Sequence, residues 1–236
     1  MSLRSIILTV LLALAGGFAG AAIWQMSGLA DANTRAYLLE NPELLPEMAA
    51  AYEAREKEKR LVEVAGKVSA PFPGMVLGNP EGSVTLVEFT DYQCGYCRQS
   101  RADVAALIAD NPDLRVVVRE WPVFEGSEAA ARMALAAAKQ NKFAAFHEAM
   151  FAAGRVSPGS IDAAARQAGL DMDRARVTAA SDEVTREIAE TMTLAERLGF
   201  TGTPSWVAGN RIVEGAVGKD RLAEALANPA PEPSGA

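Results

Sequence analysis

The 236-residue chain is poor in the side chains that most often bind metals, since it has two cysteines and one histidine. The cysteines, Cys94 and Cys97, are separated by two residues, and His147 lies far downstream. A structural zinc site takes about four ligands, so these three side chains cannot complete one within a single chain. A structural disulfide stabilises most when it closes a long loop, and this pair would close almost none. The spacing therefore disfavours both a zinc site and a structural disulfide.

Basic stretches are also missing from the sequence. The 23 Lys and Arg residues are outnumbered by 30 Asp and Glu residues, which gives a formal net charge of −7. The lack of a basic stripe that could neutralise phosphates argues against a nucleic-acid partner, and we expect none. Aromatic residues make up 6% of the chain although half of it is apolar, a composition that suits a helix-rich α/β protein. The length suffices for one sizeable core with a small appendage.

The longest apolar run lies at the N-terminus, where residues 5–24 carry no charge and follow Arg4. About 20 apolar residues can span a bilayer as a helix, but a basic leader before an apolar run also begins a secretory signal. Small residues at 19–21 offer a cleavage site, whereas the run is longer than a signal core of roughly 7–15 residues. A buried core helix is a third alternative. We expect residues 1–30 to be an export segment retained as a membrane anchor.

Residues 31–66 are predicted to form a helical arm, with a short helix followed by a longer one that the Asn-Pro pair at 41–42 initiates. Leu45, Met48 and Tyr52 give the longer helix one apolar stripe, and the stretch after them is charged. So narrow a stripe does not fold alone. The arm is therefore expected either to dock on the main domain or to pair with copies of itself in a homo-oligomer.

Beyond the arm, strand patterns and helix patterns alternate. Two apolar, β-branched runs at 84–89 and 114–121 flank a helical segment. An Ala-rich helical block follows at about 122–199, and a short hairpin and a last helix come after it. We expect an α/β fold over residues 67–228, in which a helical insertion interrupts a small sheet. The Pro-rich tail at 229–236 is predicted to be disordered.

The cysteines fall where the first of these strands turns into a helix, with Cys94 at the helix N-terminus. Unpaired backbone N–H groups and the helix dipole stabilise an anion there, so a thiolate at Cys94 is favoured. Cys97 lies one turn further on and can close a small disulfide ring with Cys94, which an incoming thiolate opens easily. We interpret the pair as a redox-active disulfide.

Two further features support redox chemistry. Glu88 interrupts the apolar strand before the cysteines, and a buried carboxyl has a raised pKa. It could accept the proton that Cys97 loses when it attacks a mixed disulfide; the alternative is a solvent-facing glutamate at a strand edge. Pro204 precedes a strand, and cis peptide bonds are essentially confined to proline. A cis Pro204 would leave the backbone groups of Thr203 free to pair with a substrate strand.

Taken together, "VTLVEFTDYQCGYC", the helical insertion and "GFTGTPSWVAGNRIVEG" resemble the DsbA-like branch of the thioredoxin superfamily over roughly residues 75–228. The resemblance implies a thioredoxin-like fold and thiol:disulfide exchange without a cofactor or metal. It also implies roles for four residues: Cys94 as nucleophile, Cys97 as resolving thiol, Glu88 as buried acid and Pro204 as the cis-proline beside the thiols.

The chain departs from the best-known member of that family at Gly95 and Tyr96, where that member has Pro-His. This dipeptide tunes thiolate stability, so the resemblance does not carry over strong oxidising power. We assign Gly95, Tyr96 and Thr203 to substrate binding. Thr203 is shared with several disulfide isomerases of the superfamily. The arm is similar to that of the ScsC-like and Com1-like subgroup, some members of which self-associate through it and shuffle disulfides.

Three functions follow from these observations. The first is a periplasmic thiol:disulfide oxidoreductase that passes its disulfide to exported, cysteine-containing proteins and has a membrane redox partner. The second is an oligomeric isomerase or reductase kept reduced by a membrane electron donor. The third is a binding module whose thiols hold a soft metal ion, which the acid and the proline beside the thiols disfavour. We expect a periplasmic protein, either anchored by its N-terminal helix or secreted after cleavage.

Overall fold

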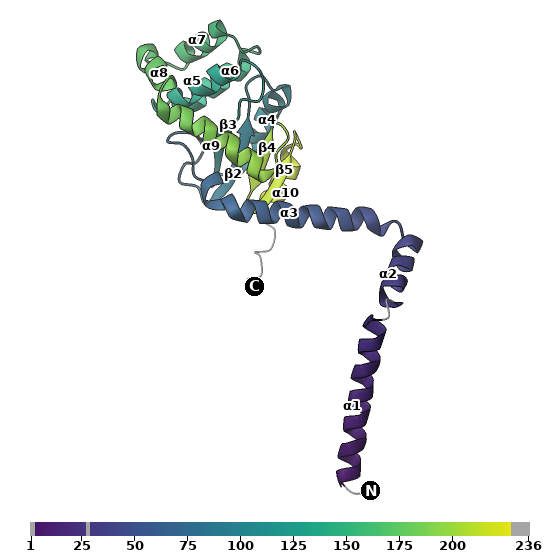
Figure 1. Cartoon of the computed structure of the whole chain (residues 1–236). Helices are drawn as coiled ribbons and strands as arrows, with labels where there is room; N and C mark the ends of the chain where they lie inside the picture. The colour runs from purple at the N-terminus through teal and green to yellow at the C-terminus, as the bar shows by residue number, and fades with distance from the viewer. Residues whose placement is uncertain (1–2, 27–28, 228–236) are drawn as a thin grey trace. The chain divides into compact units, whose positions relative to one another are not determined.

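Figure 1 shows the computed structural model of the chain, which describes residues 3–26 and 29–227. The chain divides into two compact units, Met1–Ala54 and Arg55–Ala236. The tail for which we predicted disorder lies outside the described residues.

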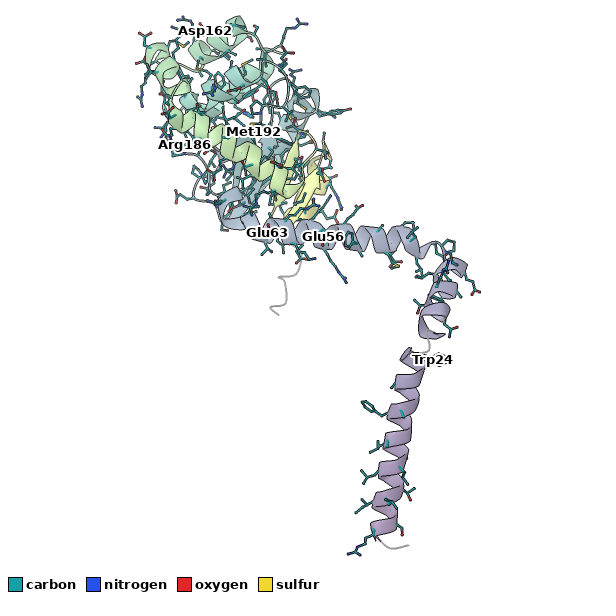
Figure 2. The ribbon with its side chains drawn as sticks, viewed as in Figure 1. Trp24, Glu56, Glu63, Asp162, Arg186 and Met192 are labelled. Carbon is teal, nitrogen blue, oxygen red and sulfur yellow. The ribbon has the colours of Figure 1, made fainter. Side chains whose placement is uncertain are left out.

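The described part of the first unit is helical. It contains α1 (Leu3–Met26), α2 (Leu29–Glu40) and the first part of α3 (Leu44–Val68). Within α1, the stretch Arg4–Ala22 is long and apolar enough to cross a membrane, and none of it is buried. Figure 2 shows side chains standing out around α1, and Trp24 near its end is exposed. The alternative of a buried core helix is therefore wrong, whereas an anchor and a signal sequence both fit a helix of this length and composition.

The helix α3 is longer than the sequence pattern indicated. The three residues of the predicted apolar stripe are exposed: Leu45, Met48 and Tyr52. From Arg55 onward the helix belongs to the second unit, and there Leu61, Val64 and Val68 are buried in a core. This second stripe starts immediately after the charged stretch, and it holds the last turns of the predicted arm against the sheet.

The second unit is built on a five-stranded sheet in the order β1-β3-β2-β4-β5. Its strands are β1 (Val76–Gly78), β2 (Val84–Thr90), β3 (Leu114–Glu120), β4 (Ser205–Ala208) and β5 (Arg211–Glu214). The pair β2 and β3 is parallel, as the strand-helix-strand pattern predicted, and the other pairs are antiparallel. We did not predict β1, because three residues are too few to show an alternating pattern.

Helices connect and cover these strands. The helix α4 (Gly95–Asp110) links β2 to β3, and α10 (Lys219–Ala227) follows β5. The predicted insertion between β3 and β4 is helical and consists of α5 (Glu128–Ala138), α6 (Phe143–Ala152), α7 (Pro158–Gln167), α8 (Met172–Ala179) and α9 (Asp182–Leu198). The expected thioredoxin-like α/β fold with a helical insertion is confirmed.

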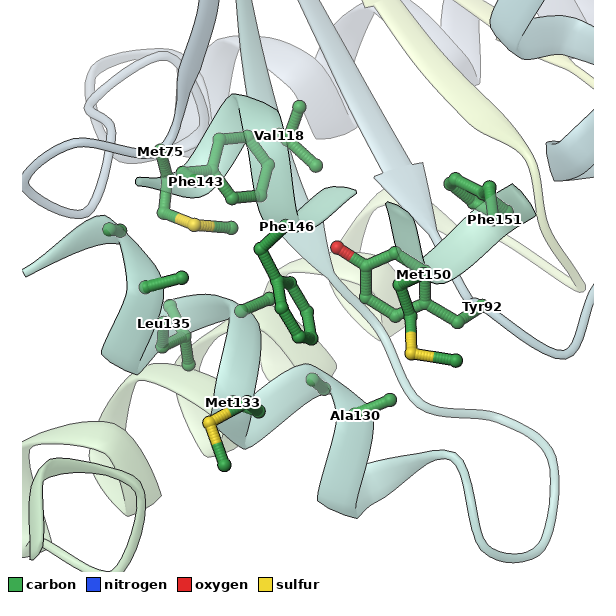
Figure 3. Packing of buried hydrophobic residues seen from close by; sticks show 14 of the residues in the cluster. Met75, Tyr92, Val118, Ala130, Met133, Leu135, Phe143, Phe146, Met150 and Phe151 are labelled. Carbon is green, nitrogen blue, oxygen red and sulfur yellow. The ribbon is translucent and has the colours of Figure 1, made fainter. Parts of the chain in front are cut away.

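The sheet separates two cores, because side chains alternate between the faces of a strand. On one face, Leu86 and Val118 pack with residues of α4, α5 and α6, and this core contains both cysteines. Figure 3 shows its aromatic part around Tyr92. On the other face, Val87 and Val117 pack with residues of α3 and α9. The face that a strand residue occupies therefore decides whether it can reach the cysteines.

Candidate active site

Cys94 is the N-cap residue of α4, at the turn that leads from β2 into the helix. Its Sγ accepts a hydrogen bond from the Cys97 backbone N–H at 3.4 Å, and its thiol donates to the Thr203 carbonyl oxygen at 3.1 Å. Both cysteines are free thiols, and their exposed fractions are 3% and 0%. An anion at this position is stabilised by the unpaired N–H groups and by the helix dipole. The predicted place of the pair at a helix N-terminus is confirmed.

A distant segment of the chain lies against the cysteines. The Thr203–Pro204 peptide bond is cis, as predicted, and the Thr203 carbonyl contacts Cys94. Between the cysteines, Tyr96 is 67% exposed, and a Cβ added at Gly95 would meet no atom within 4 Å. The dipeptide between the cysteines therefore faces solvent, while the Thr203 loop covers Cys94.

Glu88 lies on β2 and is 2% exposed. Its predicted burial is confirmed, and the alternative of a solvent-facing glutamate is wrong. On the neighbouring strands it is in register with Val118 and Trp206, which are apolar and buried. Burial raises the pKa of Glu88 to about 8, and the Thr90 hydroxyl acts in the opposite direction. A carboxyl whose pKa lies near neutrality is suited to take up and return a proton.

Cys97 is the more deeply buried thiol. Burial raises the pKa of Cys97, and the Glu88 carboxylate raises it further. The hydroxyls of Thr203 and Thr90 and a backbone group of Asp91 lower it. Cys97 therefore keeps its proton until a base removes it. Glu88 is a carboxyl close enough to influence that thiol, so the arrangement pairs a buried acid with a buried thiol.

We did not predict a role for Asp91, whose buried carboxyl group connects two loops through hydrogen bonds. It accepts four hydrogen bonds: from the N–H groups of Gln93 (2.8 Å), Val123 (2.8 Å) and Phe124 (3.1 Å) and from the Ser127 hydroxyl (2.7 Å). Because three of these donors follow β3, Asp91 holds that loop beside the loop that carries the cysteines. The only signal in the sequence was an Asp after a strand, which is common in turns.

Glu120 was not predicted as a site residue either. It is a further buried carboxyl, which ends β3 and is 3% exposed. Burial raises the pKa of Glu120 well above its usual range, the Tyr92 hydroxyl lowers it, and Asp91 and Glu88 raise it. The Tyr92 hydroxyl shares a 3.1 Å hydrogen bond with His147 Nδ1, and burial lowers the pKa of His147 to about 3. The sequence pattern placed Glu120 only within an apolar strand.

Within residues 3–26 and 29–227, no three His, Cys, Asp or Glu side chains are grouped to hold a metal ion.

Comparisons with known proteins agree with this geometry. Residues 85–227 match the family described as the DSBA-like thioredoxin domain, and residues 34–59 match the copper resistance protein ScsC N-terminal domain. Over 155 residues the chain is 32% identical to the Na(+)/H(+) antiporter NhaA 1 of Salinispora arenicola, a match that covers 64% of this chain and 24% of that protein. The chain thus spans about a quarter of the length of the curated relatives it matches.

Solved structures with a similar fold include a thioredoxin-like oxidoreductase from Silicibacter pomeroyi, with 45% identity, a TM-score of 0.61, and coverage of 65% of this chain and 90% of that one. A linker-deletion mutant of Proteus mirabilis ScsC has 25% identity, a TM-score of 0.69, and coverage of 84% and 92%. The thiol-disulfide exchange protein alpha-DsbA2 from Wolbachia pipientis has 26% identity, a TM-score of 0.66, and coverage of 74% and 97%.

Proposed function

Because this chain belongs to the DSBA-like thioredoxin family, whose members are thiol:disulfide oxidoreductases, we propose that it exchanges disulfides with exported, cysteine-containing proteins. One observation carries the proposal. The Cys94 sulfur caps α4 and contacts both the Cys97 N–H and the Thr203 carbonyl. In this proposal Cys94 is the nucleophile, Cys97 the resolving thiol and Glu88 the proton acceptor, and Pro204 fixes the loop beside them.

In the oxidising direction the reaction starts from a Cys94–Cys97 disulfide. A substrate thiolate attacks Cys94 Sγ, so that a mixed disulfide forms while the bond to Cys97 breaks. Cys97 leaves as a thiolate and takes a proton from Glu88. A second substrate thiolate then attacks the substrate sulfur of the mixed disulfide and releases the Cys94 thiolate. The substrate loses two electrons and gains a disulfide, and the enzyme becomes a dithiol.

In the opposite direction the Cys94 thiolate attacks one sulfur of a substrate disulfide, so that the substrate S–S bond breaks, the other substrate sulfur leaves as a thiolate, and a mixed disulfide forms. The Cys97 thiol then gives its proton to the Glu88 carboxylate and attacks Cys94 Sγ, which releases the substrate as a thiolate. The raised pKa of Cys97 makes this proton transfer necessary, because the thiolate and not the thiol is the nucleophile.

Substrate binding is proposed for the surface around Cys94. Tyr96 is the exposed aromatic residue beside it, and the backbone at Gly95 is unobstructed. The backbone of Thr203 lies within hydrogen-bond distance of Cys94 Sγ, so a substrate segment that pairs with it would bring its own sulfur to Cys94. This arrangement selects for an extended chain around a cysteine rather than for a particular sequence.

Disulfide isomerisation or reduction is a second candidate, and the arm favours it. Residues 34–59 match the ScsC N-terminal domain. A groove of about 540 Å³ lies between α2 and α3. It is lined by Thr34, Arg35, Leu38, Leu39, Pro42, Leu45 and Met48. We propose that this groove takes part in self-association of the chain, because several active sites around one client suit the reshuffling of its disulfides.

The N-terminal segment supports a periplasmic location. The stretch Arg4–Ala22 is long and apolar enough to cross a membrane, and both anchoring and signal cleavage would place the second unit on the far side. We propose that residues 1–30 act as an anchor and that a membrane redox partner restores the working oxidation state of Cys94 and Cys97. Disulfides persist in such oxidising compartments.

Single-cysteine variants of residues 31–236 test the proposal. The parent should catalyse dithiol–disulfide exchange with a model peptide, and Cys94→Ser should abolish it. Cys97→Ser should instead accumulate mixed disulfides that a non-reducing gel resolves. The measured equilibrium of the pair with glutathione decides between oxidation and reduction. Exchange that persists at the parent rate in the double-serine variant would refute the proposed function.

A further inference from the structure

Glu120 lies at the end of β3, on the face of the sheet that carries Glu88 and packs against the core with both cysteines. It is in register with Thr90 across the parallel pair of β2 and β3, so the two side chains leave the same face of the sheet as Glu88. The preceding residue, Arg119, lies on the other face, where it pairs with Glu187 at 2.8 Å. Glu120 is thus a buried acid on the cysteine-containing face.

The groups that face Glu120 are acids or neutral polar groups. From β2 and the turn after it come Glu88, Asp91 and Tyr92, which all affect the pKa of Glu120. The α6 residue His147 is bonded to Tyr92, and its own pKa of about 3 keeps it neutral at pH 7. Burial raises the pKa of Glu120, and the neighbouring Asp91 and Glu88 raise it further, while the Tyr92 hydroxyl lowers it.

Several buried polar atoms on or near this face of the sheet also have unused hydrogen-bonding capacity. Both carboxyl oxygens of Glu120, and the hydroxyls of Thr90, Thr203 and Ser100, are buried without a hydrogen bond of ordinary geometry. Thr90 and Thr203 lie close enough to the Cys97 thiol to lower its pKa, and Ser100 follows Cys97 by one helical turn on α4. A buried polar group without a hydrogen bond is destabilising, and such groups in native proteins are often found at functional sites.

Glu88 and Glu120 are two buried carboxyls on the same face of the sheet, where ionisation of both is disfavoured. Each charge disfavours the other, and burial disfavours both. Glu88 and Glu120 interact in this way, since the Glu88 carboxylate raises the pKa of Glu120. The carboxyl oxygens of Asp91, by contrast, accept four hydrogen bonds. The two glutamates therefore titrate as a pair that keeps a proton when the first one is lost.

We propose that Glu120 is the proton-holding partner of Glu88 in disulfide exchange. When Cys97 resolves a mixed disulfide, its thiol proton moves to the Glu88 carboxylate, while Glu120 stays a neutral acid. Glu88 can remain a carboxylate before this step only because Glu120 holds the one proton that the two carboxyls retain. Glu120 touches no reacting sulfur and acts on the reaction through Glu88. This inference rests on the proposed roles of Cys97 and Glu88.

The test is the pH profile of Cys97-dependent release of a model thiol from a mixed disulfide on Cys94, in residues 31–236. With the pair intact, two coupled steps should make the profile broader than the titration of a single group. In Glu120→Gln a single step should remain, with its midpoint lowered by about one pH unit because the like charge is gone. Carbon-13 NMR of labelled glutamate carboxyls should show the same change for the Glu88 signal.

Two further variants make the result specific. Glu120→Met replaces the acid with an apolar side chain of similar length, and it should give the same single-step profile if the amide in Glu120→Gln disturbs folding. Glu187→Gln removes a partly buried carboxyl on the other face of the sheet, and it should leave the two-step profile in place. In a Glu88→Gln background, Glu120→Gln should change the profile no further.

The outcomes separate this inference from the proposed function. If the parent shows no Cys94-dependent exchange, the proposed function itself fails. If exchange depends on Cys94 but the profiles of the parent and of both Glu120 variants coincide, only the role of Glu120 is refuted. Independent, additive effects of Glu88→Gln and Glu120→Gln on the profile would also refute it, because a shared proton makes the two effects inseparable.

Discussion

Arg119 and Glu120 are adjacent in β3, yet their buried side chains lie on opposite faces of the sheet. Arg119 donates hydrogen bonds to Glu187 of α9 and to backbone carbonyls near the end of α3, among them that of Val68 at 3.4 Å. Glu120 instead shares the other face with Glu88 and the cysteines. Because side chains alternate between the faces of β3, Arg119 lies on the face that packs against α3, and Glu120 lies on the face that carries Glu88 and the cysteines.

The first prediction concerns Glu88 and the stability of the reduced protein. The pKa of Glu88 is raised to about 8 from an ordinary value of 4.5, so the folded state binds more protons than the unfolded state between these pH values. Stability should fall as pH rises through this window, by roughly 1.4 kcal/mol per pH unit from this group. Glu88→Gln should remove that slope, and urea unfolding between about pH 4 and 9 measures it.

At the acid end of the window Glu88→Gln should have the stability of the parent, because Glu88 is then neutral in both states. Above pH 8 the variant should be the more stable protein. The exposed Glu81 offers a matched control, and Glu81→Gln should keep the slope of the parent. A Glu88→Gln protein with the same pH dependence as the parent would contradict the buried-acid description.

The second prediction concerns His147, whose pKa is lowered to about 3 from 6.5 because it is buried, with a further effect from Arg101. The unfolded state then binds the extra proton, so stability is full above pH 6.5 and is lost as pH falls toward 3. His147→Asn should be less stable at pH 7, because it removes a ring packed against Phe151 and Tyr92. The stability lost through protonation of His147 between pH 7 and pH 4 should nevertheless be absent from this variant.

Thermal unfolding at a series of pH values measures this second effect. Between pH 4.5 and 6.5, the contributions of His147 and Glu88 to stability change with pH in opposite directions. His147→Asn and Glu88→Gln should therefore change the slope of stability against pH in opposite directions in this range. A His147→Asn profile parallel to that of the parent would show that protonation of this ring does not drive acid unfolding.

The third prediction concerns the loop that Asp91 holds. Asp91→Asn replaces one accepting oxygen with an NH₂ group that meets backbone and hydroxyl donors, and it should cost about 2–4 kcal/mol of stability. Hydrogen exchange should accelerate at the Val123 and Phe124 amides, which donate to this carboxylate. The fully exposed Asp173 supplies the control substitution Asp173→Asn, for which neither change is expected. Unaltered protection of both amides in Asp91→Asn would contradict the assignment.

The fourth prediction concerns self-association through the arm. Leu39 and Leu45 are each 71% exposed and line the groove between α2 and α3. Residues 31–236 should sediment as an oligomer, and Leu45→Glu should dissociate it by placing a charge in an apolar contact. A truncated chain should begin at Arg55, because a start at residue 67 would delete Leu61 and Val64 from the core.

That truncated chain should be a folded monomer with active thiols. As a control, Val177→Glu changes a side chain that is 75% exposed in the second unit, and it should leave the oligomer intact. Monomeric behaviour of residues 31–236 at micromolar concentration would rule out self-association through the arm.

The parts of the fold that were predictable rest on local patterns. The apolar run at 84–89 is a buried strand followed directly by helical spacing, and this transition places Cys94 at a helix N-terminus. Glu88 could be recognised because a charge inside such a run must be either buried or at an edge. Local sequence was less informative for β1, whose three residues show no period, and for Leu61 and Val64, whose stripe lies behind a charged stretch.

The missed site residues depend on distant partners. Asp91 is identified by donors that follow β3, and Glu120 by its register with Thr90 and its proximity to Tyr92. No local pattern distinguishes such an aspartate from one in any turn, or such a glutamate from the exposed end of a strand. The pairing of strands creates these neighbours, so they become visible only once the sheet is assembled.

The contact between Cys94 and Thr203 spans 109 residues of the chain, with the helical insertion in between. Contacts of such long range close only after the intervening chain has been ordered. Under the proposed export from the N-terminus, the thiol pair would reach the oxidising side before the segment that covers Cys94. The protein would then be, during its own maturation, a substrate for the chemistry proposed for it, with Cys94 and Cys97 open to oxidation before Thr203 lies against them.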